Sequence, residues 1–567
     1  MDEKTLKRIK ELAIINRLKY GKANEKAVIG KLLAECPELK KNIHQLLPRI
    51  SSIVLEVNNS DITALKNKVS IEEKGKKEEK LDKLRLPNKP SKVVMRFAPN
   101  PNGPATLGSA RGIIINHELA RKYNGKFILR FDDTDPRIKR PLKEAYDWYL
   151  QDCKWLGCEP DEIYYASERI PLYYRFAEKL IEIDKAYVCF CSREEFKHYR
   201  SNGLECPHRD QSVKENLEFW KGMLSNAYEE GECVLRIKTD MQHKDPAVRD
   251  WVAFRIIKNA QHPKVGSKFE VWPTLDFESA IEDKLLGITH ILRGKDLIDS
   301  EKRQRYIYNY LGWKYPKVIH WGRIKLEEFG KFSTSLLRKG IEEGKYLGWD
   351  DPKLPTLLAL RRRGITAEAI KRVMLSLGIS DTDISLSIKN IYAENRKLLD
   401  SKVNRYFFVS EPRKLKIHGI CCDKNEIEVK LPLHPSFPER GYREHKLKVV
   451  NGSLELYIST EDSKHLKIGE EIRLMNLFNI VIEDISREEI KARWLKEKNM
   501  KVKKIQWLSD GIKAKIIKPN AIDTGLAEHH CLNLSQGEII QFERYGFCRL
   551  DSIEENGKRL VFYFAHK

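Results

Sequence analysis

The sequence lacks the features of membrane, secreted and repeat proteins. It has no run of about 18 apolar residues, which excludes a transmembrane helix. The charged start, MDEKTLKRIKELAII, has no apolar signal core, so we expect a cytoplasmic protein. Eleven cysteines among 567 residues are too few for a disulfide scaffold, and in a reducing compartment clustered cysteines indicate a metal site before a disulfide. No internal repeat is present.

Acidic residues are scarce relative to basic ones. Lys and Arg number 104 against 82 Asp and Glu, which gives a net charge of +22 and a pI of about 9.3. Two interpretations remain open. The excess positive charge either lies on a solvated basic surface or binds a polyanionic partner, because neutralising phosphates drives nucleic-acid binding.

The chain is long enough for three or four domains, and its patterning predicts a multidomain α/β plus all-β protein. The chain begins with apolar residues at helical spacing, followed by a charged stretch closed by prolines. Two βαβ-like patterns then flank an insertion, and further helical patterns and a run of short strands complete the chain. The expected segments are a helical N-terminal extension (1–68), a linker (69–92), the first half of an α/β core (93–184), an insertion (185–270), the second half of the core (271–349), a helical segment (350–403) and β-barrels (404–567).

The stretch RFAPNPNGPATLGSARG, residues 96–112, lies between a β-branched run and a helical pattern. In a doubly wound sheet, the first strand-to-helix turn presents backbone N–H groups and the positive end of a helix to phosphate. Pro99 helps to shape such a turn, and Gly108 permits close backbone approach. Alone, the stretch fits an ordinary Gly/Pro loop equally well.

A second stretch, FGKFSTS at residues 329–335, supports the nucleotide interpretation. It contains a glycine, a lysine and hydroxyl side chains that could reach a triphosphate: Gly330, Lys331, Ser333 and Ser335.

The two stretches resemble the His-Ile-Gly-His and Lys-Met-Ser-Lys-Ser signatures of class I aminoacyl-tRNA synthetases. From residue 92 onward, strings such as RFDDTDP, IEDKLLGITHILRGKDL, DPKLPTLLALRRRGI and VNRYFFV resemble archaeal-type glutamyl-tRNA synthetase. The front helices resemble the tRNA-affinity extension of that branch, and the β-rich end resembles its anticodon-binding barrels.

The resemblance implies a Rossmann core with an acceptor-end-binding insertion and a helical connector that contacts the tRNA stem. It implies ATP, Mg²⁺ and L-glutamate as substrates and cofactor, and transfer of glutamate to the 3′-terminal adenosine of tRNA(Glu). Charging of tRNA(Gln) is left open, and we expect a monomer. The alternatives are a glutaminyl-tRNA synthetase and a catalytically inactive tRNA-binding paralogue.

Both signatures depart from the family pattern. The first reads Thr106-Leu107-Gly108-Ser109 and the second Lys331-Phe332-Ser333-Thr334-Ser335, so both histidines and the second lysine are replaced. Hydroxyls donate hydrogen bonds without charge, and charge-assisted bonds are roughly twice as strong. We therefore expect Thr106 and Ser109 to contact phosphate, with Lys331 and Arg111 supplying positive charge.

By the same resemblance, Arg96 and Arg293 contact the amino acid, and Asp132 holds its ammonium group. Arg293 favours glutamate, because glutaminyl enzymes usually carry a neutral residue there and a buried carboxylate needs a cationic partner. Asp135 also favours a glutamyl over a glutaminyl enzyme. Leu275 stands where relatives often place tyrosine, so the pocket hydroxyl must come from elsewhere.

The insertion contains a Cys-x-Cys and a Cys-x-His pair, Cys189, Cys191, Cys206 and His208. Three thiolates and an imidazole suit tetrahedral zinc. The alternative is a set of buried free thiols.

Arginines in two regions are candidates for tRNA contact. Arg361, Arg362 and Arg363 open an expected helical segment, and three consecutive arginines cannot all face a core. In the barrels, arginines beside aromatic residues suit unstacked bases, although ordinary barrel corners would also explain them: Arg440, Arg443, Arg544 and Arg549.

Overall fold

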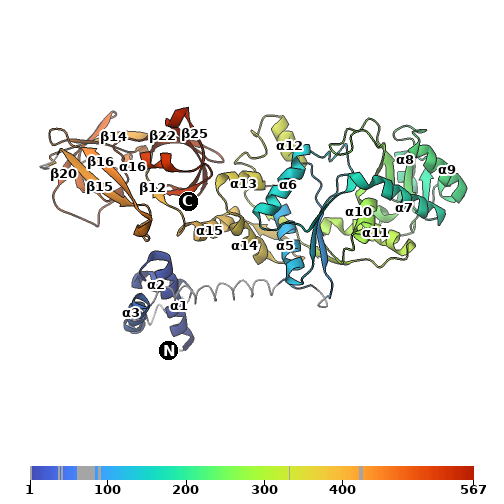
Figure 1. Cartoon of the computed structure of the whole chain (residues 1–567), viewed down its shortest axis with the longest axis horizontal. Coiled ribbons are helices and arrows are strands. Elements are labelled where there is room, and N and C mark those ends of the chain that lie inside the picture. The colour runs from blue at the N-terminus through green and yellow to red at the C-terminus, as the bar shows by residue number, and fades with distance from the viewer. Residues whose placement is uncertain are drawn as a thin grey trace. The chain divides into compact units, whose positions relative to one another are not determined.

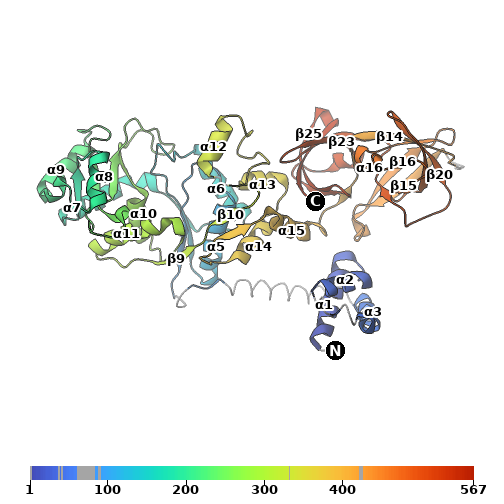
Figure 2. The same cartoon turned by 180° about the vertical axis from the view of Figure 1, so that it is seen from behind.

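The computed structural model describes residues 3–35, 39, 43–60, 84–86, 91–330, 333–420 and 425–567 (Figures 1 and 2). Residues 61–68 of the expected extension, most of the expected linker 69–92, Lys331 and Phe332 lie outside these ranges. The chain forms two compact units. One comprises Lys80–Ala359 and Ala367–Ile391; the other comprises Met1–Glu79, Leu360–Thr366 and Tyr392–Lys567. Among the described residues, no helix is long and apolar enough to cross a membrane.

Three helices form the described N-terminal part: α1 (Glu3–Tyr20), α2 (Glu25–Glu35) and α3 (Ile43–Asn59). Their apolar residues recur at helical spacing and pack into one small core that includes Ile9, Leu12, Val28, Leu32 and Ile50.

A parallel sheet underlies the first unit. Strands β1 (Val94–Phe97), β2 (Lys126–Phe131) and β3 (Glu162–Tyr165) pair in the order β1-β2-β3, and β8 (His290–Gly294) pairs with β9 (Lys317–Trp321). The N–H of Thr289 donates to Val94 O at 3.0 Å, so β8 begins beside β1. The strand order therefore reverses between β1 and β8, and in such sheets ligands bind at the carboxyl ends of the strands at this reversal.

Helices and one further strand pair complete this unit. They are α5 (Leu107–Lys122), α6 (Lys143–Trp155), α10 (Leu275–Leu285), α11 (Ile298–Tyr310), α12 (Thr334–Glu342), α14 (Ala367–Leu377), β10 (Ile324–Leu326) and β11 (Ile384–Leu386). Two helices, α13 (Leu357–Arg363) and α15 (Ile388–Leu399), begin in this unit and end in the other.

The insertion folds around its own antiparallel sheet, ordered β4-β5-β6-β7. Two of its helices begin with capping boxes, Ser192 with Glu195 and Ser212 with Glu215, which satisfy backbone N–H groups at each helix start. The sheet and the helices packed with it are α7 (Ile170–Glu182), which precedes the insertion, β4 (Ala186–Cys189), α8 (Arg193–Asn202), α9 (Val213–Leu224), β5 (Val234–Ile237), β6 (Val252–Ile256) and β7 (Val271–Pro273), which directly follows it.

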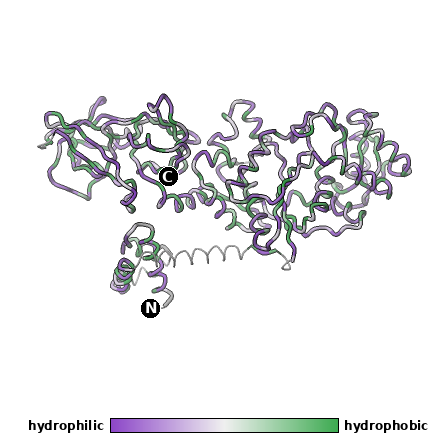
Figure 3. Tube along the Cα trace, viewed as in Figure 1, coloured by the Kyte–Doolittle hydropathy of each residue, from purple (hydrophilic) through white to green (hydrophobic). Residues whose placement is uncertain are grey.

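The C-terminal part is all-β and has two cores, one around Ile417, Leu456 and Ile490 and one around Ile516, Phe542 and Phe562. Figure 3 shows hydrophobic and hydrophilic residues mixed along its trace, and buried and exposed residues alternate along strands such as Leu454–Ser459. A seven-stranded sheet runs β12-β24-β25-β26-β22-β23-β13, a six-stranded sheet runs β17-β14-β20-β19-β18-β21, and β15 pairs with β16. The predicted fold class, α/β followed by all-β, is confirmed.

These strands are β12 (Arg405–Tyr406), β13 (Phe408–Ser410), β14 (Pro412–His418), β15 (Glu426–Pro432), β16 (Tyr442–Lys448), β17 (Leu454–Ser459), β18 (Glu471–Leu474), β19 (Asn479–Ile485), β20 (Glu489–Leu495), β21 (Lys504–Ile505), β22 (Ile512–Ile517), β23 (Ile522–Ala527), β24 (Ile539–Phe542), β25 (Gly546–Glu554) and β26 (Arg559–His566).

Candidate active site

The turn after β1 leads directly into α5 at the point where the strand order reverses. A side chain at Gly112 would overlap the ring of Phe97, so the glycine lets α5 lie close against β1. Thr106 is the N-cap of α5, and its hydroxyl makes no capping hydrogen bond. The positive end of the helix therefore faces the carboxyl end of β1, as a phosphate site requires.

The structure brings the second stretch against this turn. A Cβ atom at Gly103 would overlap the side chain of Thr334, the first residue of α12. Ser333 caps α12, because its hydroxyl accepts the N–H of Leu336 at 3.3 Å. Ser333 and Ser335 are exposed, and Gly330 has the positive φ of 62° that favours glycine.

Thr106 and Ser109, which stand in place of the signature histidines, lie at the N-terminus of α5. Ser109 is half-buried and hydrogen-bonds to Tyr149, whose pKa burial raises to about 12. Gly108 is exposed, and among the described residues a Cβ atom there would approach the Thr106 hydroxyl, at 3.7 Å. Pro99 O accepts the N–H of Asp132 at 3.0 Å, which ties the turn to the end of β2.

Arg111 does not lie at the predicted phosphate site, and this prediction is corrected. Its side chain is buried, donates to Gly322 O and Gly378 O at 2.9 Å each, and stacks over Trp321. Burial lowers its pKa to about 10. Arg111 therefore fixes α5 to the segment after β9 and to the end of α14.

The three residues predicted to hold the amino acid lie at neighbouring strand ends. Arg96 comes from β1, Arg293 from β8, and Asp132 directly follows β2. All three are at least nine-tenths buried. The carboxyl ends of parallel strands meet at one edge, and that is where the sequence predicted the pocket.

Asp283, on α10, joins the two arginines and was missed by sequence reasoning. Arg96 donates to both of its oxygens at 3.1 Å, and the Arg293 guanidinium lies 3.9 Å away. Burial opposes ionisation of Asp283, but the charges of Arg96 and Arg130 outweigh it and lower the pKa to about 2.

Arg130 on β2 was also missed. It is fully buried, donates to both Asp132 oxygens at 2.6 and 3.1 Å, to Asp283 at 2.7 Å and to the Ser279 hydroxyl at 2.9 Å. The indication in the sequence was the alternation in RFDD, because residues two apart on a strand share a face.

The charges of this network do not cancel. Burial, with the neighbouring Asp132 charge, raises the pKa of Glu278 well above its usual range, which favours its neutral form, and the Thr134 hydroxyl donates to its second oxygen at 2.6 Å. With Glu278 in that form, three guanidinium groups face the two carboxylates Asp132 and Asp283, an excess of one positive charge. A ligand with one net negative charge would balance the site.

Arg293 has hydrogen-bonding capacity to spare. It donates to Gln304 at 3.1 Å, and its Nε has no hydrogen-bond partner among the described residues. Leu275, at the start of α10, is 41% exposed. A hydroxyl is available instead from Tyr308, which is buried and has no hydrogen-bond partner in the described part of the chain.

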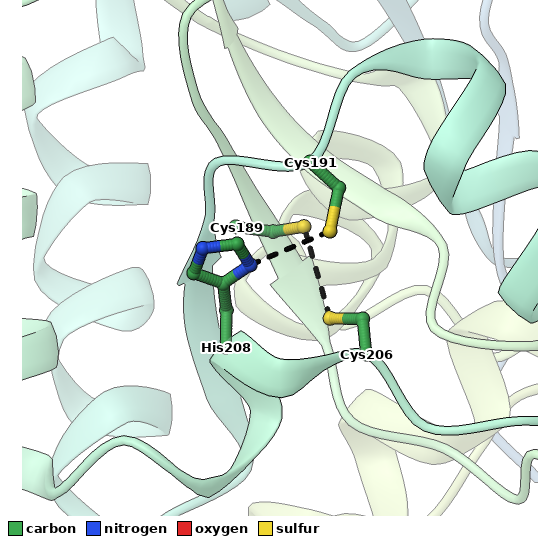
Figure 4. A group of neighbouring side chains, drawn as sticks. All are labelled: Cys189, Cys191, Cys206 and His208. Atoms are coloured by element: carbon green, nitrogen blue, oxygen red, sulfur yellow. Dashed lines mark hydrogen bonds between the residues drawn. The ribbon is translucent and has the colours of Figure 1, made fainter.

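The four residues of the predicted zinc knuckle lie together (Figure 4). Cys189 ends β4, and Cys206 and His208 lie on the turn before α9. Cys191 Sγ lies 3.4 Å from His208 Nδ1, Cys189 Sγ lies 3.9 Å from Cys206 Sγ, and the four ligand atoms are all within 4.8 Å of one another. Three sulfurs and one ring nitrogen at this spacing fit a tetrahedral zinc ion.

A cavity of about 260 Å³ lies beside the knuckle. Its walls come from α8, β5, the segment before β6, and the starts of α10 and α11. Four arginines line it, Arg200, Arg236, Arg249 and Arg303, with Asp250 and Asp276. Its positive lining suits an anionic ligand.

The predicted tRNA-contact arginines divide into two sets. Arg363 and Arg443 are buried, which contradicts their predicted contact with tRNA. Arg363 donates to Phe564 O and Ala565 O, and Arg443 pairs with Glu528 at 2.8 Å and Glu543 at 3.2 Å.

The remaining five arginines are exposed or partly exposed. Arg362 and Arg549 both approach Asp551, Arg544 forms two 2.7 Å bonds to Asp462, and Arg440 donates to the carbonyls of Ser401 and Lys402. Arg361 is partly exposed.

In this doubly wound parallel sheet, the N-terminus of a helix and a second loop face each other where the strand order reverses. That arrangement is typical of nucleotide-binding α/β enzymes. The family described as tRNA synthetases class I (E and Q), catalytic domain, matches residues 92–401. Two families described as its anticodon-binding domain match residues 403–497 and 493–551. The chain therefore belongs to the class I tRNA synthetases of the E and Q family, as its motifs predicted.

Relatives named glutamate–tRNA ligase match the chain along its length. The relative from Archaeoglobus fulgidus is 53% identical over 98% of this chain and 99% of its own. That from Methanosarcina acetivorans is 50% identical over 99% of both chains, and that from Pyrococcus furiosus is 48% identical over 98% of both.

Proposed function

We propose that the protein is a glutamate–tRNA ligase that activates L-glutamate with ATP and esterifies it to the 3′-terminal adenosine of tRNA(Glu). The observation that carries the choice of amino acid is the single excess positive charge of the network of Arg96, Arg130 and Arg293. Glutamate has two carboxylates and one ammonium, so its net charge balances this excess. Glutamine has no net charge and would leave a buried guanidinium unbalanced.

The chemistry follows from the site. The α-carboxylate of glutamate attacks the α-phosphate of ATP in line, the bond to pyrophosphate breaks, and glutamyl-adenylate forms. The adenosine hydroxyl of tRNA then attacks the activated carbonyl and releases AMP. In the first step the start of α5, Thr106, Ser109 and Lys331 are the proposed donors to phosphate, and Mg²⁺ would neutralise further charge.

The signature hydroxyls are testable by removing them singly. Thr106→Val and Ser109→Ala should each slow activation roughly 2- to 13-fold, because a neutral hydrogen bond contributes about 0.5–1.5 kcal/mol. Glutamate-dependent ATP–pyrophosphate exchange in the presence of tRNA measures the effect. Unchanged exchange in both variants would show that neither hydroxyl contacts phosphate.

We propose that the knuckle of Cys189, Cys191, Cys206 and His208 holds a structural zinc ion that shapes the insertion. Cys189→Ser should lower the zinc content of the purified protein by one ion per chain, as measured by mass spectrometry of the metal. It should also weaken charging of tRNA more than adenylate formation. A zinc content equal to that of the unaltered protein would leave the four residues as packing groups.

The insertion and the barrels supply the proposed tRNA contacts. The arginine-lined cavity suits phosphates of the single-stranded acceptor end, and Arg361, Arg362, Arg440, Arg544 and Arg549 are proposed contacts elsewhere. A monomer in the cytoplasm is proposed for the whole chain, and use of tRNA(Gln) as a second substrate depends on anticodon contacts.

Exchange assays separate this function from the alternatives. A ligase catalyses ATP–pyrophosphate exchange that depends on glutamate and tRNA, whereas an inactive tRNA-binding paralogue binds tRNA without exchange. A glutaminyl enzyme would show exchange with glutamine instead.

A further inference from the structure

A second group of metal-ligand side chains lies in the all-β part, far in sequence from the cysteine knuckle. His445 is on β16, Glu528 follows β23, and His530 is in the 3₁₀ turn His529–Asn533. One ligand atom from each of the three lies within 4.8 Å of the other two.

Each of the three side chains has a buried atom without a hydrogen-bond partner among the described residues. These atoms are His445 Nε2, Glu528 Oε1 and His530 Nδ1. The side chains of Glu528 and His445 are 1% and 9% exposed. Leaving such groups unpaired is costly, so three of them side by side indicate a missing partner.

The spacing of the three groups suits a cation better than mutual hydrogen bonds. His445 Nε2 lies 3.5 Å from Glu528 Oε2, too far for a good hydrogen bond. Two ligand atoms that each lie about 2.1 Å from a tetrahedral zinc ion are roughly 3.4 Å from one another. Small side-chain rotations would therefore bring the three ligand atoms to zinc-binding distance.

Two features produce this arrangement: the alternation of buried and exposed residues along β16, and one buried ion pair. Along β16, Arg443, His445 and Leu447 occupy alternate positions and are the least exposed residues of the strand. Arg443 and the N–H of Phe407 both bind Glu528 Oε2, which leaves Oε1 for another partner. Arg443 also pairs with Glu543, so two carboxylates face its one charge.

We propose that His445, Glu528 and His530 bind one Zn²⁺ ion, with a fourth position left for water. Two imidazoles and a carboxylate are a ligand set that zinc accepts. The ion would connect the β15–β16 hairpin to the segment after β23 and stabilise that connection. The site is independent of the proposed catalytic activity and of the cysteine knuckle.

Proton positions change when the ion binds. His530 Nε2 accepts the N–H of Glu444 at 3.2 Å, so without metal the ring proton is on Nδ1. Coordination through Nδ1 would move that proton to Nε2 and break the hydrogen bond from the N–H of Glu444.

Zinc stoichiometry tests the proposal on the full chain. After equilibrium dialysis against micromolar Zn²⁺, the unaltered protein should hold two ions per chain and Cys189→Ser one. His445→Gln and His530→Gln should also hold one, whereas the exposed control His529→Gln should keep two. Added Zn²⁺ should raise the melting temperature of Cys189→Ser protein but not that of Cys189→Ser/His445→Gln, because a ligand of the native state stabilises it.

One ion in the unaltered protein and none in Cys189→Ser would overturn the proposal. That measurement needs no variant of the barrel site, so a misfolded His445→Gln protein cannot obscure it. Failure of the proposed ligase activity would leave the expected stoichiometry unchanged.

Discussion

Replacing Arg293 by cysteine is expected to lower kcat/KM for glutamate at least ~30-fold, because removing one partner of a buried charge pair commonly costs 2–5 kcal/mol. Arg293 is 5% exposed, and its Nε has no hydrogen-bond partner among the described residues, so its charge is available to a carboxylate ligand. The weak reaction with glutamine should change little. Steady-state charging of tRNA(Glu) with each amino acid measures both effects.

Arg372→Cys is the matched control. Arg372 lies on α14, is partly exposed and pairs with Glu368 one helical turn away, and such surface pairs contribute little. Glutamate kinetics of Arg293→Cys within threefold of the unaltered protein would remove Arg293 from the amino-acid site.

Replacing Arg130 by methionine is expected to lower the free energy of unfolding of the catalytic unit by about 3–5 kcal/mol, since it leaves buried carboxylates uncompensated. Arg130 is fully buried and binds Asp132, Asp283 and Ser279. Urea unfolding followed by tryptophan fluorescence measures the loss.

A second substitution separates charge from packing. If uncompensated charge is the cause, Arg130→Met/Asp283→Asn should be less destabilised than the sum of the two single variants. A loss below about 1 kcal/mol in Arg130→Met would mean that the carboxylates find other partners or protons.

Local patterns predicted much of the fold. The β-branched run before residue 98, the helical pattern after it and the strand KFILRFDD correspond to β1, α5 and β2. The pairs Cys-x-Cys and Cys-x-His predicted a cluster, and the four side chains do converge. These features depend on short-range spacing, which is visible in one sequence.

Long-range partners could not be predicted in this way. Arg111 binds carbonyls more than 200 residues away, and Arg443 pairs with Glu528 and Glu543, which follow β23 and β24. Nothing in a local pattern distinguishes such an arginine from one that binds phosphate. Asp283 likewise looked like one acid on a charged helix until the fold placed it between Arg96 and Arg293.

The charge of the amino-acid pocket is the central claim, and the ratio of kcat/KM values for glutamate and glutamine tests it most directly. Purified tRNA(Glu) and tRNA(Gln) are charged by the unaltered protein with each labelled amino acid in turn. The excess positive charge predicts a preference for glutamate of at least ~30-fold on any tRNA that the protein accepts. Equal charging with glutamine would contradict it.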